Sequence, residues 1–162
     1  MHMKTKEHLI AELEQARAVT RALLRDLETA SPEQREVYPT WTIKEFLAHI
    51  TGWDDACIAT LQAVSRGEPG DTPAAGGFDP FNAANVSRRM ALSLDEVIQE
   101  LERTRAVFLQ AIRDLPDERA GEAFVSPWGP IIHLPEMVQV FAEHEIEHVE
   151  EIRARLSGHA AE

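Results

Sequence analysis

Residues 41–53 read WTIKEFLAHITGW and carry the clearest helix start in the chain. Thr42 stands at the N-cap position and Glu45 follows three residues later, which is the spacing of a capping box. Trp41 and Phe46 occupy the two positions of a hydrophobic staple, which fixes how the chain enters a helix. This stretch therefore predicts a long helix. The fold class depends on whether the rest of the chain contains other long helices.

Three other segments repeat apolar residues at three- and four-residue spacing, the pattern of an amphipathic helix with one buried stripe. Together with the first they give four long predicted helices, at about Thr5–Glu28, Thr42–Arg66, Ser93–Leu115 and Leu134–Leu156. Four such helices predict an all-α protein, most naturally a four-helix bundle.

The segments between the long helices predict smaller features. A stretch rich in Gly and Pro, Gly67–Gly77, predicts an exposed loop, and a short extra helix is expected at about Pro80–Met90. A short helical turn is expected from Ser31, ending before Pro39. No segment predicts a strand and no repeat divides the chain, so we expect one domain over residues 1–162 with long connecting loops. The first three residues resemble a cloning remnant.

Composition excludes several classes of function. The chain has 162 residues, of which 44% are apolar, so it can bury a sizeable core. Its 16 Lys and Arg against 28 Asp and Glu give a net charge of −12, which argues against nucleic-acid and anionic-membrane partners. No apolar run approaches the roughly 20 residues of a membrane span. The single cysteine cannot form an internal disulfide, so we expect a cytoplasmic protein.

The last predicted helix contains the sequence AEHEIEHVEE at residues 142–151. His144 and His148 are four residues apart, so both project from one face of the helix and can converge on a single ion. They also continue an apolar stripe, which consists of Met137, Phe141, His144, His148 and Ile152. Two imidazoles thus occupy positions where the helical pattern predicts core residues, and a bound metal would pair both.

A third histidine, His49, shares a helical stripe with Phe46 and Trp53, so it is also expected to point inward. Three neutral imidazoles from two facing helices suit Zn²⁺, Ni²⁺ or Fe²⁺. Three protein ligands leave a position for water or substrate, as in catalytic rather than structural metal sites. The alternative is three core histidines that are satisfied by glutamates or backbone groups, and the sequence leaves both interpretations open.

Several glutamates lie near these histidines in the sequence. Glu45 precedes His49 by one turn and is a weak candidate for a catalytic base, although its place in the capping box explains it equally well. Five acids crowd the last helix, and we expect most of them outside the buried stripe: Glu143, Glu145, Glu147, Glu150 and Glu151. Glu145 and Glu147 are candidates for orienting the histidines, but a solvated face is the simpler interpretation.

Other polar and aromatic residues carry weaker signals. Asn82 and Asn85 lie three apart on the short helix, where they either line a pocket mouth or stay on the helix surface. Trp53 and Trp128 are candidates for the walls of a substrate pocket or for ordinary core residues. Cys57 lies about two turns beyond His49, too far to share its ligand, and is expected to be a small core residue.

The combination of WTIKEFLAH at residues 41–49 with a late His144-x-x-x-His148 resembles the DinB-like superfamily of damage-inducible proteins. The resemblance covers nearly the whole chain. It implies a four-helix bundle that holds one divalent metal through three histidines, often in a homodimer. Matched by position, the implied metal ligands are His49, His144 and His148. Family members with an assigned activity transfer low-molecular-weight thiols or hydrolyse small molecules.

These observations give one leading expectation and two alternatives. The leading one is a divalent-metal-dependent transferase or hydrolase that acts on a small molecule, with a low-molecular-weight thiol as a candidate cosubstrate. The second is a non-catalytic bundle that binds a metal or another ligand in its interior. The third is a structural or dimerisation module in which the histidines satisfy one another. No catalytic triad, phosphate-binding glycine loop or CxxC motif competes with the histidines.

Overall fold

The computed structural model describes residues 4–27, 36–38 and 41–158 and confirms the all-α fold. The four long helices are α1 (Lys6–Leu27), α2 (Ile43–Ser65), α4 (Leu94–Asp114) and α6 (Leu134–Leu156), and the two short ones are α3 (Phe78–Arg88) and α5 (Asp117–Ala120). In the described part of the chain, none of these helices has an apolar stretch long enough to cross a membrane.

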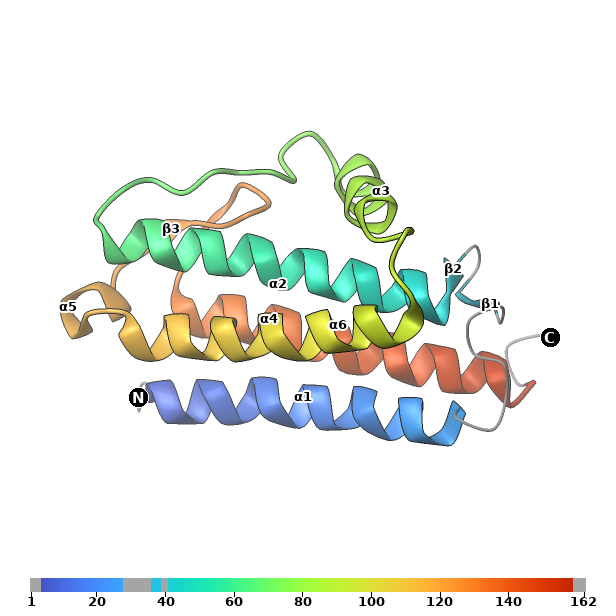
Figure 1. Cartoon of the computed structure of the whole chain (residues 1–162). Coiled ribbons are helices and arrows are strands. Elements are labelled where there is room, and N and C mark those ends of the chain that lie inside the picture. The colour runs from blue at the N-terminus through green and yellow to red at the C-terminus, as the bar shows by residue number, and fades with distance from the viewer. Residues whose placement is uncertain (1–3, 28–35, 39–40, 159–162) are drawn as a thin grey trace.

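The long helices form a bundle in which α1 packs along α6 and α2 packs along α4 (Figure 1). The colour gradient in Figure 1 shows that α2 and α4 run in the same direction, opposite to α1 and α6. The 23-residue helix α2 is about 34 Å long at about 1.5 Å per residue, and the chain must return over that length before α4 can start. The loop after α2, together with α3, makes this return across the outside of α2.

The predicted helix starts at α2 and α4 are present. The Thr42 hydroxyl accepts a hydrogen bond from the backbone N–H of Glu45. At α4, Ser93 and Glu96 form the complete capping box, with each side chain bonded to the backbone of the other. These caps satisfy backbone N–H groups that have no partner within the helix, which explains why both starts could be located in the sequence.

The expectation that the chain has no strands was wrong. Two short antiparallel hairpins are present: β1 (Glu36–Tyr38) with β2 (Trp41–Thr42), and β3 (Phe124–Val125) with β4 (Ile131–Ile132). Strands of two or three residues are too short to show an alternating pattern, so the sequence carries no period-2 signal for them. The short helix α5 was also not expected. The helical turn predicted from Ser31 lies mostly outside the described residues.

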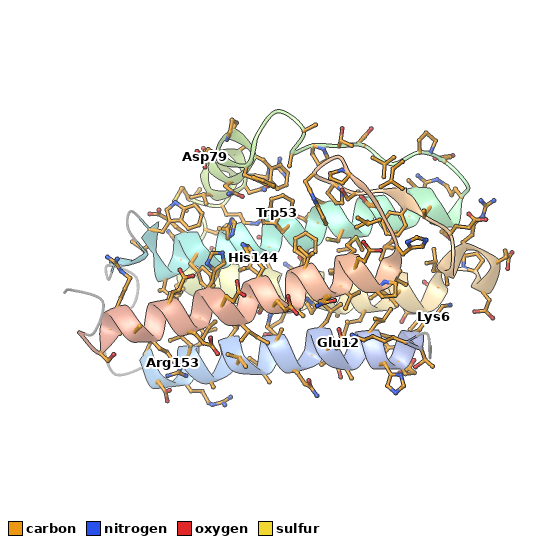
Figure 2. The ribbon with its side chains drawn as sticks, turned by 180° about the vertical axis from the view of Figure 1, so that it is seen from behind. Lys6, Glu12, Trp53, Asp79, His144 and Arg153 are labelled. Atoms are coloured by element: carbon orange, nitrogen blue, oxygen red, sulfur yellow. The ribbon has the colours of Figure 1, made fainter. Side chains whose placement is uncertain are left out.

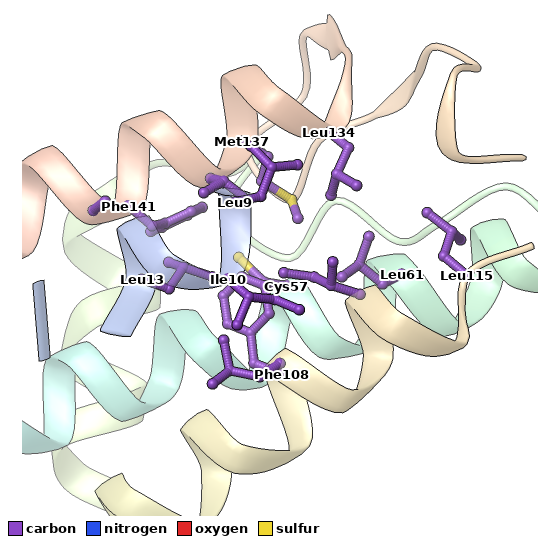
Figure 3. Close-up of a cluster of buried hydrophobic side chains, with 14 of the residues drawn as sticks. Leu9, Ile10, Leu13, Cys57, Leu61, Phe108, Leu115, Leu134, Met137 and Phe141 are labelled. Carbon is purple, nitrogen blue, oxygen red and sulfur yellow. The ribbon is translucent and has the colours of Figure 1, made fainter. Parts of the chain in front are cut away.

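The core consists of two apolar clusters, which occupy opposite ends of the bundle. The first surrounds Cys57 and Phe108, both fully buried, and is drawn in Figure 3. The second surrounds Phe46 and Leu101, which are also fully buried. Burying Cys57 raises the pKa of its thiol well above the usual value, in agreement with its predicted role as a small core residue.

Helix α3 is held firmly against α2 (Figure 1). Asn85 packs onto Gly52, where even a methyl group would come within 2.2 Å of the amide carbon. Arg89, at the end of α3, pairs with Asp55 on α2 and with Glu100 on α4. A glycine on α2 and a pair of salt bridges therefore fix α3 over the segment of α2 that carries His49.

Candidate metal centre

The structure brings the three predicted histidines together. His49 from α2 meets His144 and His148 from α6, and one ring nitrogen of each lies within 4.8 Å of the other two. The ring centroid of His49 lies 5.5 Å from that of His144 and 5.7 Å from that of His148. His49 is buried and the other two are half-buried. We call these three residues the histidine cluster, and this arrangement can hold a metal ion.

All three imidazoles are held in the neutral form that binds metals. Burial and the nearby histidines lower the pKa of His49 to about 3. Burial and His148 lower the pKa of His144 to about 4, and burial lowers that of His148. Because a low dielectric penalises the imidazolium ion, near neutral pH each ring is neutral and carries a lone pair on one of its two nitrogens.

Asn82 on α3 determines which nitrogen of His49 carries the proton. Its Oδ1 lies 3.0 Å from the indole Nε1 of Trp53 and 3.1 Å from Nδ1 of His49. An indole N–H can only donate, so Oδ1 is an acceptor, and the His49 Nδ1 must donate to it. The lone pair of His49 is therefore on Nε2, the nitrogen on the far side of the ring from Asn82.

The Nε2 atom of His49 is buried and has no hydrogen-bond partner among the described residues. A buried nitrogen without a partner costs about 1–3 kcal/mol, so proteins rarely keep one. The Nε2 atoms of His144 and His148 lie 2.6 Å apart, so one ring can donate a hydrogen bond to the other. A divalent ion would accept the lone pair of His49 and those of its two neighbours, and this donor set fits Zn²⁺, Ni²⁺ or Fe²⁺.

The histidine cluster lies in the wall of a cavity of about 760 Å³. Figure 2 shows His144 on the side of α6 that faces α2 and α3, below Trp53. The other lining residues are mainly aromatic: Trp41, Trp53, Phe78, Asp79, Asn82, Ala83, Trp128, Val140 and Phe141. Trp53 and Trp128 thus line a pocket, as one of the two interpretations of the sequence predicted. The volume is within the range typical of small-molecule sites.

Glu45, the weak candidate for a catalytic base, is not among the described residues that line the cavity. Its backbone N–H donates to the Thr42 hydroxyl, which is one of the two hydrogen bonds of the predicted capping box. Asn85 is also absent from the lining, because it is buried against Gly52. Neither Glu45 nor Asn85 is among the described residues that could contact a molecule in the cavity.

The expectation that Glu145 lies on a solvated face was wrong, since its side chain is 1% exposed. Its carboxylate accepts from Arg17, Arg105 and Thr20, at 2.8, 2.8 and 2.6 Å. Both arginines also pair with Asp54 on α2. We call Arg17, Asp54, Arg105 and Glu145 the four-charge layer. It takes one residue from each long helix and separates the two apolar clusters of the core.

Two features of the site were not found from the sequence. Trp41 was assigned to a hydrophobic staple, but its ring packs on His49 with centroids 4.8 Å apart. For Asn82 the sequence leaves open a pocket mouth or the helix surface; it lines the cavity, and no sequence pattern indicates its hydrogen bond to His49. Both contacts depend on where the β1–β2 hairpin and α3 are placed, and no helical periodicity encodes that placement.

Comparisons with known proteins agree with this description. The crystal structure of the mycothiol-dependent maleylpyruvate isomerase aligns with a TM-score of 0.70 at 17% identity, covering 93% of this chain. The chain spans 63% of the length of that isomerase. A structure from Streptococcus pneumoniae aligns with a TM-score of 0.76 at 17% identity, covering 97% of this chain and 93% of that one. At these identities the structures show a shared fold.

No curated protein matches the chain in sequence. A family model does match, and it extends from residue 12 to residue 152, which includes α2 and α4 in full, most of α1 and α6, and the whole histidine cluster. This confirms the resemblance found in the sequence: the chain belongs to the DinB superfamily.

Proposed function

We propose that the protein is a divalent-metal-dependent enzyme that acts on a small molecule, as a thiol-dependent transferase or a hydrolase. One observation carries the proposal: three neutral histidines converge in the wall of a cavity of about 760 Å³, and the buried Nε2 of His49 has no partner in the described chain. A metal held by three histidines keeps a position for water or substrate, and the cavity offers the space.

The chain's own residues would position the reaction. A divalent ion lowers the pKa of a bound water or thiol, so that a nucleophile forms near neutral pH. His49, His144 and His148 would hold the ion, and Asn82 would keep the His49 lone pair directed away from α3. Trp53 and Phe141 would exclude water from one side of the reacting groups.

A thiol nucleophile would have to come from a cosubstrate. The single cysteine, Cys57, is fully buried in the first apolar cluster and does not line the cavity. The mycothiol-dependent isomerase has the same fold, which supports a low-molecular-weight thiol as the cosubstrate here. The non-catalytic alternative shares the metal but would show no turnover. The purely structural alternative is disfavoured because His49 Nε2 has no partner among the described residues.

Metal analysis tests this proposal. We expect protein purified without a metal column to bind about one equivalent of Zn²⁺ or Ni²⁺, because three converging imidazoles bind such ions well. His148→Ala should lose most of the affinity, since two remaining ligands hold a divalent ion poorly. His133→Ala is the matched control, because His133 lies at the start of α6 and outside the histidine cluster. Equal affinity in wild type and His148→Ala would overturn the ligand set.

Turnover assays then separate an enzyme from a binder. Metal-loaded protein is incubated with para-nitrophenyl acetate alone, to detect hydrolysis, and with cysteine plus benzyl chloride, to detect chloride release by thiol transfer. We expect wild type to accelerate one of these reactions and His148→Ala to lose the acceleration. A protein that binds one equivalent of metal and accelerates neither would favour the non-catalytic alternative.

A further inference from the structure

We infer that the cavity takes a flat aromatic molecule that carries a single metal-binding group, and that it rejects dianions. This inference rests on the proposed function for the role of the metal, but its argument comes from the walls of the cavity. The chain has three tryptophans, and all of them, Trp41, Trp53 and Trp128, line this one cavity. Tryptophan supplies large, rigid and flat contact area, so the walls match a flat apolar ligand.

Mutual packing holds these walls in place before any ligand enters. The Trp53 ring lies 4.5 Å from that of Phe81 and 5.5 Å from that of Phe141, measured between centroids. The indole N–H of Trp53 is fixed by Asn82, and Trp128 packs edge-on against Phe141 at 5.7 Å. A preformed aromatic wall lowers the entropy cost of binding a rigid ring.

The charges around the cavity select against a second anionic group. Among the described residues that line it, none is Lys or Arg, and Asp79 is the only charged one. Two cations on the helices that line the cavity are engaged elsewhere: Arg89, at the end of α3, pairs with Asp55 and Glu100, and Lys44 on α2 donates to the backbone carbonyls of Met90 and Leu92. One carboxylate or similar group can pair with the metal, but a second would find no Lys or Arg among the described lining residues and would share the cavity with Asp79.

The mouth of the cavity is apolar as well. The large exposed hydrophobic residues include Phe78, at 55% exposed, and Val140, at 44%, and both line this cavity. The carbonyl oxygen of the Asn82 side chain is already shared between His49 and Trp53. The histidine cluster is therefore the main polar anchor, and an aromatic ligand would cover apolar surface that water otherwise contacts.

Three hydroxamates with the same metal-binding group test the inference on zinc-loaded protein. Acetohydroxamate has no ring, benzohydroxamate adds one, and meta-carboxybenzohydroxamate adds a second negative charge. Because the ring buries apolar area against the walls, we expect calorimetry to show roughly tenfold tighter binding of benzohydroxamate than of acetohydroxamate. The extra carboxylate should remove roughly tenfold or more of that affinity. Equal binding of the first two, or tighter binding of the third, would overturn the inference.

A pair of surface variants locates the binding. Phe78→Ser should weaken benzohydroxamate several-fold and leave acetohydroxamate unchanged, because only the aromatic ligand reaches the mouth. Ile131→Ser is the matched control: Ile131 is 71% exposed on β4 and lies outside the described lining. Since all three tryptophans line the cavity, quenching of their fluorescence should accompany binding. An equal effect of both variants would place the aromatic ligand elsewhere.

Metal-free protein separates this inference from the proposed function. Benzamide has the ring but only a weak metal-binding group, so saturation-transfer NMR with benzamide reports on the walls alone. Transfer that is reduced by Phe78→Ser supports the aromatic site even if the protein binds no metal, in which case only the proposed function fails. If the protein binds zinc but shows no preference for rings, the inference fails and the metal site stands.

Discussion

Two groups of polar side chains lie inside this bundle, and they differ in how they are satisfied. In the four-charge layer, two arginines and two acids from four helices pair with one another, and both arginines also donate to backbone carbonyls. In the histidine cluster, His49 keeps a buried nitrogen without a partner in the described chain. The two groups are neighbours, because His144 and Glu145 are consecutive on α6.

The difference lies in whether the described residues alone satisfy the buried polar atoms. The four-charge layer balances its own charge: the guanidinium groups of Arg105 and Arg17 outweigh the effect of burial and lower the pKa of Glu145 to about 2. Its four charged groups are paired with one another within the bundle. In the histidine cluster, the described residues leave the Nε2 atom of His49 without a hydrogen-bond partner, and the cluster faces a cavity. A buried group that its own chain leaves incomplete points to a binding partner.

The largest expected effect comes from breaking the four-charge layer. Glu145→Ala leaves Arg17 and Arg105 to share the single carboxylate of Asp54, deep inside the bundle. Removing one partner of a buried ion pair costs about 3–5 kcal/mol, because the remaining charge is uncompensated. Urea denaturation of metal-free protein measures the resulting loss in the free energy of unfolding.

Glu150→Ala is the matched control for this loss, because Glu150 lies on the same helix and is exposed. A surface substitution of this kind should change the free energy of unfolding by less than about 0.5 kcal/mol. If Glu145→Ala does not fold, Glu145→Gln, which keeps the volume and one acceptor oxygen, still allows the measurement. A loss below about 1 kcal/mol in either Glu145 variant would show that the four-charge layer is not a structural unit.

The sequence predicted the histidine cluster but not the four-charge layer, for a physical reason. Helical spacing placed His49, His144 and His148 on inward faces, and the capping signals located the helix that carries His49. Glu145 looked like one of several surface acids. Its burial depends on Arg17 and Arg105, which lie 128 and 40 residues away in the chain, and no local pattern links them.

The bundle itself was predictable because each long helix carries its own periodic stripe. The hairpins and α5 were not, since segments of two to four residues have too few positions to show a period. The same limit applies to Asn82, whose role at the site depends on the packing of α3 against Gly52. Local patterns thus specified the helices and their inward faces, while contacts between distant segments decided the details of the site.

The second-largest expected effect is a loss of metal affinity when the hydrogen bond between Asn82 and His49 is removed. Asn82→Ala removes the acceptor that holds the proton of His49 on Nδ1, so the ring can turn or change tautomer. Loss of such a supporting hydrogen bond typically weakens metal binding by about 10–100-fold. Competition with a chromophoric chelator measures the zinc affinity of each variant.

Two variants of α3 make this measurement specific. Asn82→Asp keeps an acceptor oxygen at the same place and should retain most of the affinity. Ser87→Ala changes an exposed residue on the same helix and should leave the affinity unchanged. If Asn82→Ala binds zinc as tightly as wild type, the Asn82 contact does not orient His49.

The smallest expected change in the free energy of unfolding comes from replacing His49, and it tests most directly how the histidine cluster differs from the four-charge layer. His49→Leu replaces an imidazole of similar volume and removes the unpartnered nitrogen, while Asn82 keeps its bond to Trp53. In metal-free protein we expect urea denaturation to show a free energy of unfolding within about 1 kcal/mol of wild type, or above it, because a desolvated polar atom disappears. Zinc, which should stabilise wild type by mass action, should no longer stabilise this variant. A loss as large as that of Glu145→Ala would instead mean that the bundle needs His49 for its own stability. A raised stability would mean that the metal-free protein keeps His49 at a cost in its own free energy of unfolding, which a bound ligand would offset.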